Sequence, residues 1–240
     1  RMKETRFFYC PDAAQSHCLP DEEAQHAVRV LRLKEGDEIM LMDGKGVYYQ
    51  AIITLASNKK CMYDIQQAMP QQRQWHNHIT LSIAPTKLMD RMEWMCEKIT
   101  EMGIDEIRFL CTRYSERKVI KLPRIEKIVV SAVKQSHKAW LPDIADMTSI
   151  DEFLNEPRQG VKLIAHCHDT IERRSAKEIM ANAPKGSPIT ILIGPEGDFS
   201  EEEVRNAMLQ GYIPVSLGES RLRTETAGMY AVAMAHIASR

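Results

Sequence analysis

Apolar runs and amphipathic segments alternate along the chain from residue 79 onward, and this alternation constrains the fold more than any other feature. Short apolar runs predict strands at 79–84, 106–111, 161–166, 189–193 and 213–217. Helical spacing of apolar residues predicts helices at 87–102, 123–136, 200–210 and 226–239. Strands that alternate with helices in this way are typical of an α/β fold with a mainly parallel sheet.

Local signals mark the ends of two of these helices. In the first, an apolar stripe is followed by Gly103, which stands where a C-terminal cap belongs. In the third, Ser200 and Glu203 form a capping-box pattern, and Gly211 ends the helix. The stripe consists of Leu88, Met92, Met95, Ile99 and Met102.

The first seventy residues have a different pattern and predict a compact β-rich unit. Strands are expected at 38–42 and 47–54, and the Asp43-Gly44 turn between them is typical of a hairpin. A further strand is expected at 62–65.

A short helix at 21–32 is expected to place Arg29 and Arg32 three positions apart on one face. The polar segment 70–74 has no periodic pattern, so we place the domain boundary there. The expected domains are 1–72 and 73–240.

Composition and charge exclude several classes of protein. The 240 residues are 44% hydrophobic and 27% charged, as in ordinary globular domains. No apolar run approaches the roughly 20 residues that span a membrane, and no signal-peptide pattern is seen, so a cytoplasmic protein is expected. Six cysteines without paired spacing predict free thiols.

The net charge of −1 argues against a protein that coats nucleic acid through its global charge. One stretch, from Arg113 to Lys138, nevertheless holds eight lysines and arginines against Glu116 and Glu126. This stretch fits either a solvated helix face or a local basic surface.

The segment Gly194-Pro195-Glu196-Gly197 follows an apolar run and opens a helix. Glycine at the carboxyl end of a strand lets a ligand approach the backbone, and open α/β sheets bind ligands at that edge. Glu196, Asp198 and the acids at 201–203 repel a polyphosphate and favour a neutral or cationic ligand. The nucleotide fingerprints G-x-G-x-x-G and G-x-x-x-x-G-K-[ST] are absent, and a simple tight turn remains the alternative.

The second segment runs from Leu217 to Ala227 and leads into the last helix. Thr224 or Thr226 can cap that helix. Arg221 and Arg223, however, stand ahead of a helix N-terminus, where cations are disfavoured, and so indicate an anionic partner. Since about twenty residues separate the two segments, they can form one pocket.

A metal site is not expected. His166-Cys167-His168-Asp169 lies at a strand end, where adjacent side chains point to opposite faces and rarely close a tetrahedral site. No nucleophile elbow of the form G-x-S-x-G is present.

On these motifs the chain resembles the 16S ribosomal RNA (uracil-1498-N3)-methyltransferases, the small-subunit methyltransferase E group of the SPOUT superfamily. The resemblance covers essentially the whole chain. It departs from the family at two places: Asp198 stands where a second glycine is usual, and the segment 137–140 replaces an arginine-containing stretch. The matching residues are 26–32, Gly36-Asp37, Asp43-Gly44, Lys87, Arg91, Glu93, Lys98, Thr100, Glu101, Gly103, 115–117, Gln135-Ser136, 194–197 and 217–227.

The resemblance implies an N-terminal PUA-like β-barrel that binds RNA and a SPOUT-type C-terminal domain with a trefoil knot. It also implies a homodimer that uses S-adenosyl-L-methionine to methylate N3 of one uridine in the small ribosomal subunit. The cofactor residues that it implies are Leu192, Gly194, Pro195, Glu196, Gly197, Leu217, Gly218, Leu222 and Thr226.

Uracil N3 carries a proton and is a poor nucleophile, so transfer requires that the proton leave or that the imide anion be stabilised. We expect Arg223 to stabilise that charge and Glu225 to accept the proton. Lys138 and Trp140 offer a charge and a stacking face to RNA. The residues expected to contact RNA phosphates are Arg29, Arg32, Arg113, Arg117, Lys138 and Arg221.

Two other functions fit parts of the pattern. One is a non-catalytic RNA-binding module, against which the intact motifs at 194–197 and 223–225 count. The other is an α/β enzyme with a nucleotide cofactor, against which the missing phosphate fingerprint counts.

Overall fold

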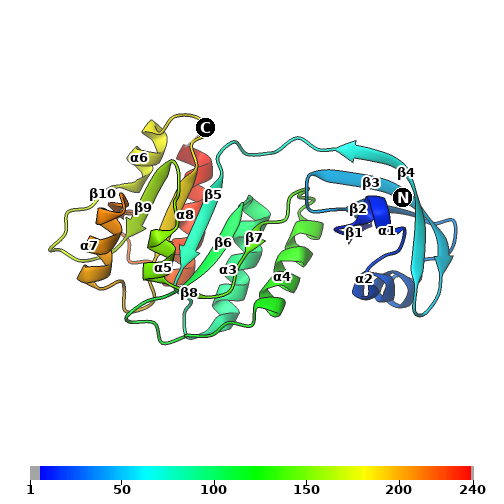
Figure 1. The fold of residues 1–240 in the computed structure, drawn as a ribbon, viewed down its shortest axis with the longest axis horizontal. Coiled ribbons are helices and arrows are strands. Elements are labelled where there is room, and N and C mark those ends of the chain that lie inside the picture. Colours follow the sequence, from blue (N-terminus) through cyan, green and yellow to red (C-terminus); the bar gives the residue numbers. More distant parts are fainter. Residues whose placement is uncertain (1–5, 239–240) are drawn as a thin grey trace. The chain divides into compact units, whose positions relative to one another are not determined.

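The structure is a computed structural model that describes residues 6–238. The chain forms two compact units (Figure 1). The N-terminal unit contains the residues up to Gln74 together with Val130–Leu141, and the C-terminal unit contains Trp75–Val129 and the residues from Pro142 on. The sequence pattern gave no sign that residues 130–141 group with the N-terminal unit.

The N-terminal unit is built on one four-stranded sheet in the order β1-β2-β3-β4. β1 pairs parallel with β2, whereas β2, β3 and β4 pair antiparallel. The hairpin predicted at Asp43-Gly44 is confirmed, and Asp43 Oδ1 accepts hydrogen bonds from the backbone N–H groups of Lys45 and Val47. The strands are β1 (Phe7–Tyr9), β2 (Glu38–Met42), β3 (Val47–Ala56) and β4 (Cys61–Pro70).

Two short helices cover this sheet's apolar side, α1 (Ala13–Ser16) and α2 (Asp21–Gln25). The second continues into a π-helical turn, η1 (His26–Val30). Arg32 follows with φ of 54°, in the left-handed region. The prediction that Arg29 and Arg32 share one helix face is therefore wrong, because helical spacing ends before Arg32.

In the C-terminal unit all the paired strands run parallel, in the order β10-β12-β9-β11-β5-β6-β7, and β8 also pairs with β6. β5, β6, β9, β11 and β12 match the predicted strands to within one residue. The strands are β5 (Ile79–Ile83), β6 (Glu106–Cys111), β7 (Asp143–Ile144), β8 (Thr148–Ser149), β9 (Val161–Ala165), β10 (Arg174–Ser175), β11 (Ile189–Ile193) and β12 (Ile213–Ser216).

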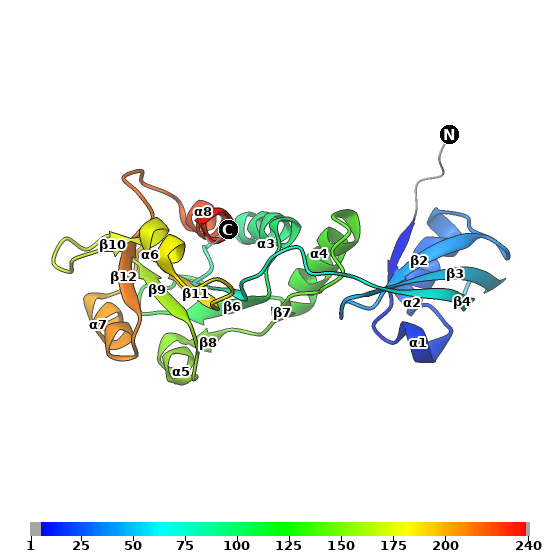
Figure 2. The same cartoon turned by 90° about the horizontal axis from the view of Figure 1, so that it is seen from above.

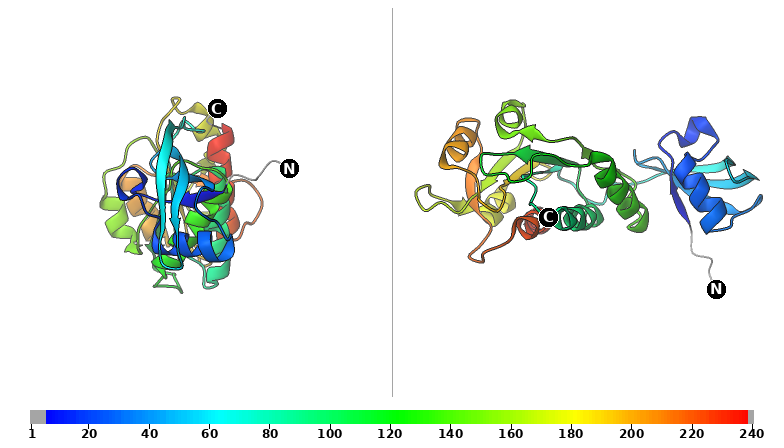
Figure 3. Two further views of the ribbon diagram at one scale, coloured as in Figure 1. Left: turned by 90° about the vertical axis from the view of Figure 1, so that its right-hand side faces the viewer. Right: turned by 90° about the horizontal axis from the view of Figure 1, so that it is seen from below.

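Helices cover both faces of this sheet (Figure 2). Helices α3 (Met89–Met102) and α8 (Thr224–Ala238) lie side by side on one face, and α5 (Ile150–Asn155) and α7 (Glu201–Leu209) lie on the other (Figure 3). α6 (Ala176–Asn182) packs against α8, and α4 (Leu122–Gln135) follows β6 in the chain. α8 begins two residues earlier than predicted, and Ser239 lies outside the described residues.

The helix-end predictions at Gly103 and at Ser200 and Glu203 are confirmed. Gly103, with φ of 109°, donates its N–H to the carbonyls of Ile99 and Thr100 at the end of α3. Ser200 and Glu203 form the capping box of α7. Of the predicted stripe on α3, Met92, Met95 and Ile99 are buried, whereas Leu88 and Met102 at its ends are exposed.

The central strands β5 and β11 are buried along their whole length, as covering of both sheet faces requires. Leu110, Leu192 and Phe199 belong to a buried cluster with Phe153 of α5 and Val204 of α7. Between residues 6 and 238, no helix is long and apolar enough to cross a membrane.

Candidate functional site

Because the strands of the C-terminal sheet are parallel, the loops that follow β5, β6, β9, β11 and β12 leave from one edge. β11 lies between β9 and β5, so the loop Gly194–Gly197 stands near the middle of that edge. This is where open α/β sheets bind ligands.

Two contacts join this loop to the starts of α3 and α8, and a third joins the two helices to each other. Thr224 Oγ1 donates a hydrogen bond of 3.2 Å to the carbonyl of Gly194, which links the two segments that the sequence singled out. The backbone N–H of Lys87 donates to Glu196 Oε1 at 2.9 Å. Arg91 Nη1 lies 3.7 Å from Glu225 Oε1. The two segments and the start of α3 therefore form one site.

The loop after β6 closes a further side of the site. The guanidinium of Arg117 donates two hydrogen bonds to the carbonyl of Lys87, at 3.2 and 2.7 Å. A Cβ atom on Gly197 would lie 3.0 Å from Cβ of Tyr114. Because the backbone passes so close to Tyr114, a side chain larger than that of Gly197 would collide with Tyr114.

Two further glycines shape the loops. A Cβ atom on Gly194 would lie 2.9 Å from the backbone nitrogen of Phe199, so a larger residue would force the loop open. Gly218 has φ of 137°, and nothing lies within 4 Å of where its Cβ would be. Its backbone is thus open to an approaching ligand.

Asp198 explains the departure from the expected second glycine. Its φ is 66°, in the left-handed region that glycine or a short polar residue tolerates best. Its carboxylate accepts hydrogen bonds from the backbone N–H groups of Cys167 at 2.8 Å and Phe199 at 2.7 Å. The aspartate therefore adopts the glycine-like backbone and also connects the loops after β9 and β11.

Glu225 lies in the first turn of α8, and its side chain is only 8% exposed. Oε1 faces Arg91, whereas Oε2 is buried and has no hydrogen-bond partner. A buried carboxylate oxygen without a donor is costly, and such groups occur where a ligand supplies the donor. Arg223 is exposed just ahead of the same helix, and its carbonyl accepts from the N–H of Ala227.

The nine residues predicted to hold a cofactor differ in exposure. Leu192 packs into the buried cluster, and Gly194 and Pro195 are also buried. Glu196, Gly197 and Gly218 are exposed, and the residues of intermediate exposure are Leu217, Leu222 and Thr226.

The residues predicted to contact RNA fall in both units. In the C-terminal unit Arg113 and Arg221 are exposed, and Arg113 lies 3.5 Å from Glu202. Arg117 already uses its guanidinium to hold the start of α3.

In the N-terminal unit, Arg29 is exposed and donates to the carbonyl of Asn58 at 3.4 Å, and Arg32 is exposed. Lys138 is half-buried. The ring of Trp140 packs over Gly46, where a Cβ would lie 2.7 Å from it. One face of the Trp140 ring thus packs on the β2–β3 hairpin and is not available to stack on an RNA base.

The His166-Cys167-His168-Asp169 segment follows β9 and supports the Gly194 loop. His168 Nε2 lies 2.5 Å from the carbonyl of Phe199, and the N–H of His168 donates to His166 Nδ1 at 3.1 Å. Burial lowers the pKa of His166. Within the described part of the chain, no group of three His, Cys, Asp or Glu side chains could hold a metal ion.

The sequence reasoning left Lys87 and Arg91 out of the predicted site. Both contact site residues that lie more than 100 positions away, Glu196 and Glu225. The family resemblance already included both among its matching residues, and strand order explains their place, because β5 neighbours β11 and the start of α3 follows β5. Local pattern does not reveal that order.

Comparison with known proteins identifies relatives over nearly the whole chain. The model of the RNA methyltransferase domain matches residues 73–236, and that of the RNA methyltransferase PUA domain matches residues 19–61. The ribosomal RNA small subunit methyltransferase E of Bacillus subtilis is 27% identical over 234 residues, which cover 92% of this chain and 90% of that protein.

Solved structures agree with this result. A protein of Porphyromonas gingivalis, described as a probable rRNA-methyltransferase, has a TM-score of 0.89 and 44% identity over 98% of both chains. The Neisseria gonorrhoeae ribosomal RNA small subunit methyltransferase E, bound to S-adenosylmethionine, has a TM-score of 0.79 and 29% identity over 96% of both chains. A Legionella pneumophila protein with the same bound cofactor has a TM-score of 0.85 and 28% identity over 97% of both chains.

Proposed function

The chain belongs to the RNA methyltransferase family, and we propose that it methylates N3 of one uridine, of the uracil-1498 type, in 16S ribosomal RNA. It is an enzyme that depends on S-adenosylmethionine. The main support for this site is that the Gly194 loop, the start of α3 and the start of α8 contact one another, and that the buried carboxylate of Glu225 lies among them.

The residues at this edge fit S-adenosylmethionine. Gly197 and Gly218 leave backbone groups accessible, and Glu196 and Asp198 give the loop a negative charge that suits a sulfonium cation. When bound, the cofactor supplies the methyl group and takes back the electron pair of the broken carbon–sulfur bond. The predicted cofactor residues, from Leu192 to Thr226, remain our proposal for its pocket.

In the proposed mechanism, Glu225 accepts the N3 proton of uracil, and the exposed Arg223 stabilises the negative charge that develops on the flanking carbonyl oxygens. The target base must be unpaired for N3 to reach the site. Positioning of N3 against the methyl group supplies much of the rate.

We further propose a trefoil knot in a SPOUT-type domain that spans 73–240. Support comes from chain order: β12 lies outside β9, yet α8, which follows it, returns to pack against α3, β5 and β11. The last helix thus passes back beside the loop after β11. The PUA match at 19–61 supports an RNA-binding β-barrel within 1–72.

A homodimer is also part of the proposal. Trp94 of α3, and Tyr230 and Ile237 of α8, are large apolar side chains exposed on two neighbouring helices. A second copy of this chain would cover them. Since the substrate is ribosomal, we place the enzyme in the cytoplasm, where it would act in ribosome biogenesis.

Arg29, Arg32, Arg113, Lys138 and Arg221 remain proposed RNA contacts, of which all but the half-buried Lys138 are exposed. Their charges would set affinity, while the shape of the small ribosomal subunit selects the site. Arg117 is proposed to contribute through its remaining exposed surface.

The test is calorimetric titration of the purified protein with S-adenosylmethionine, in parallel with a Gly197→Arg variant. We expect micromolar binding to the wild type and none to the variant, because the added side chain would collide with Tyr114 and fill the site. Ala181→Arg, which places the same side chain on an exposed position of α6, should bind normally. Absence of binding to the wild type, or normal binding to Gly197→Arg, would contradict the proposal.

A further inference from the structure

The contact between Arg91 and Glu225 is asymmetric. Arg91 Nη1 approaches Oε1 of the carboxylate at 3.7 Å, and the other oxygen, Oε2, has no partner although it is buried. Glu225 is 8% exposed, whereas Arg91 is 40% exposed. The carboxylate therefore has one oxygen held by charge and one oxygen free to accept a hydrogen bond.

Arg91 occupies a favourable place for such a role. It lies in the first turn of α3, directly after the segment whose backbone binds Glu196 and Arg117. Those contacts fix the start of α3 against the loops after β11 and β6. Arg91 is thus anchored on a well-supported helix, and its charge can hold the Glu225 carboxylate in one orientation.

We propose that Arg91 is a positioning residue that orients Glu225 so that Oε2 receives the imide proton of the target base. This inference rests on the proposed function and deepens it. In the step, Oε2 takes the N3 proton and leaves the N–H electron pair on N3. That pair then forms the new bond to the methyl carbon, and the carbon–sulfur pair returns to sulfur. The products are N3-methyluracil, S-adenosylhomocysteine and protonated Glu225.

The arrangement also selects the class of base. Uracil presents an N–H at N3, which matches an unpaired carboxylate oxygen. Cytosine presents a lone pair there, which the same oxygen would repel, and a mismatch between buried polar groups gives strong discrimination. Glu225, oriented by Arg91, therefore favours a pyrimidine that carries a proton on N3.

The experiment compares Arg91→Gln, Arg91→Lys and, as a matched control, Lys98→Gln. Lys98 lies on the same helix and pairs with Glu97 and Glu101, away from Glu225. For each protein we measure the Kd for S-adenosylmethionine, and kcat and KM for methyl transfer to undermethylated small ribosomal subunits. Melting temperature reports whether each variant is folded.

Arg91→Gln should lower kcat by about tenfold or more, since a misplaced general base loses much of its contribution. The Kd for the cofactor and the KM for the subunit should stay within about threefold, because Arg91 is proposed to act only through Glu225. Arg91→Lys should recover part of kcat, and Lys98→Gln should match the wild type.

A double-mutant cycle separates positioning from general stability. In a Glu225→Gln background, Arg91→Gln should cause no further loss of kcat, because the two residues act as one unit. Additive losses, an unchanged kcat in Arg91→Gln, or a parallel loss of cofactor binding would overturn the inference. A wild-type protein that neither binds the cofactor nor methylates subunits would instead overturn the proposed function.

Discussion

Asp198 stands where glycine is usual, and it can replace glycine because both residues adopt the left-handed backbone conformation that this position requires. The loop needs a left-handed conformation at this position, and aspartate meets it by accepting two backbone hydrogen bonds. The sequence correctly marked the position as unusual, but only the structure shows Cys167 as its partner.

Asp198→Gly should keep the loop conformation and lose both hydrogen bonds. We expect the free energy of unfolding to fall by about 1–3 kcal/mol, since each lost bond contributes roughly 0.5–1.5 kcal/mol. Urea unfolding measures this change. Asp198→Asn, which still accepts through Oδ1, should lie between the two, and an unchanged unfolding midpoint in Asp198→Gly would contradict the connecting role.

The side chain of Arg223 is exposed just before α8, so its removal should leave the packing of the protein unchanged. Arg223→Ala should therefore abolish methylation, while cofactor binding stays within a few-fold, because the arginine is proposed to act on charge that appears only in the transition state. Tritium transfer and calorimetry measure the two effects. A variant that methylates normally would remove Arg223 from the mechanism.

At the scale of elements, long periodic segments were predictable and short ones were not. From residue 79 onward, the five main strands and four main helices appear with ends within two residues of those predicted. The missed elements are two to seven residues long, too short to show a periodic pattern: β1, β7, β8, β10, α1, α5 and α6.

The candidate site was predictable only in part, for a related reason. The segments 194–197 and 217–227 could be singled out from the sequence by their glycines and charged residues, and the hydrogen bond between Thr224 and Gly194 joins them. Lys87 and Arg91 come from the first strand–helix unit of the domain, and their place beside β11 depends on a strand order that no local interaction encodes. The prediction that Arg32 shares a helix face with Arg29 was wrong for a local reason, since a π-helical turn ends the regular helix before Arg32.

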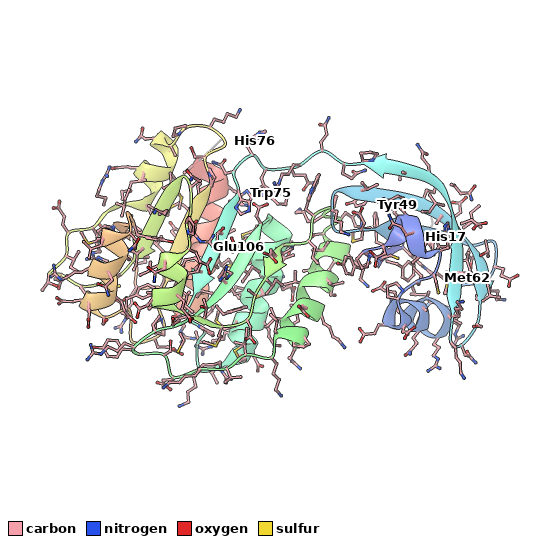
Figure 4. All side chains as sticks on the ribbon, viewed as in Figure 1. His17, Tyr49, Met62, Trp75, His76 and Glu106 are labelled. Atoms are coloured by element: carbon pink, nitrogen blue, oxygen red, sulfur yellow. The ribbon has the colours of Figure 1, made fainter. Side chains whose placement is uncertain are left out.

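At the scale of the C-terminal unit, a buried charge network joins distant parts of the chain. Glu106 on β6, labelled in Figure 4, accepts hydrogen bonds from Arg108, Arg158 and Thr80 of β5. Burial alone would raise the pKa of Glu106, but the bonds and charges of Arg158 and Arg108 lower it to about 2. Arg158 and Arg108 also stack on Phe153.

This network predicts acid sensitivity. Because the pKa of Glu106 is lower in the folded chain than in the unfolded one, its stabilisation is complete above about pH 4.5 and is lost as the pH falls toward about 2. Glu106→Gln should flatten that loss and, at pH 7, destabilise the protein by about 1.5–3 kcal/mol, because Arg108 and Arg158 lose charge-assisted hydrogen bonds to Glu106 but keep those to Glu156. Denaturant unfolding at several pH values measures both effects. Equal acid sensitivity in wild type and variant would place the cause elsewhere.

The late arrival of β11 in the middle of the sheet has a consequence for synthesis. β5 and β9 are its two neighbours, and both leave the ribosome before it, β5 by more than 100 residues. Until residue 193 emerges, β5 is paired only with β6, and β9 has no partner because its other neighbour, β12, is made later still. The nascent chain then presents open edges that favour association with other chains. Chaperone demand for this enzyme should therefore extend from the emergence of β5 until β11 has emerged.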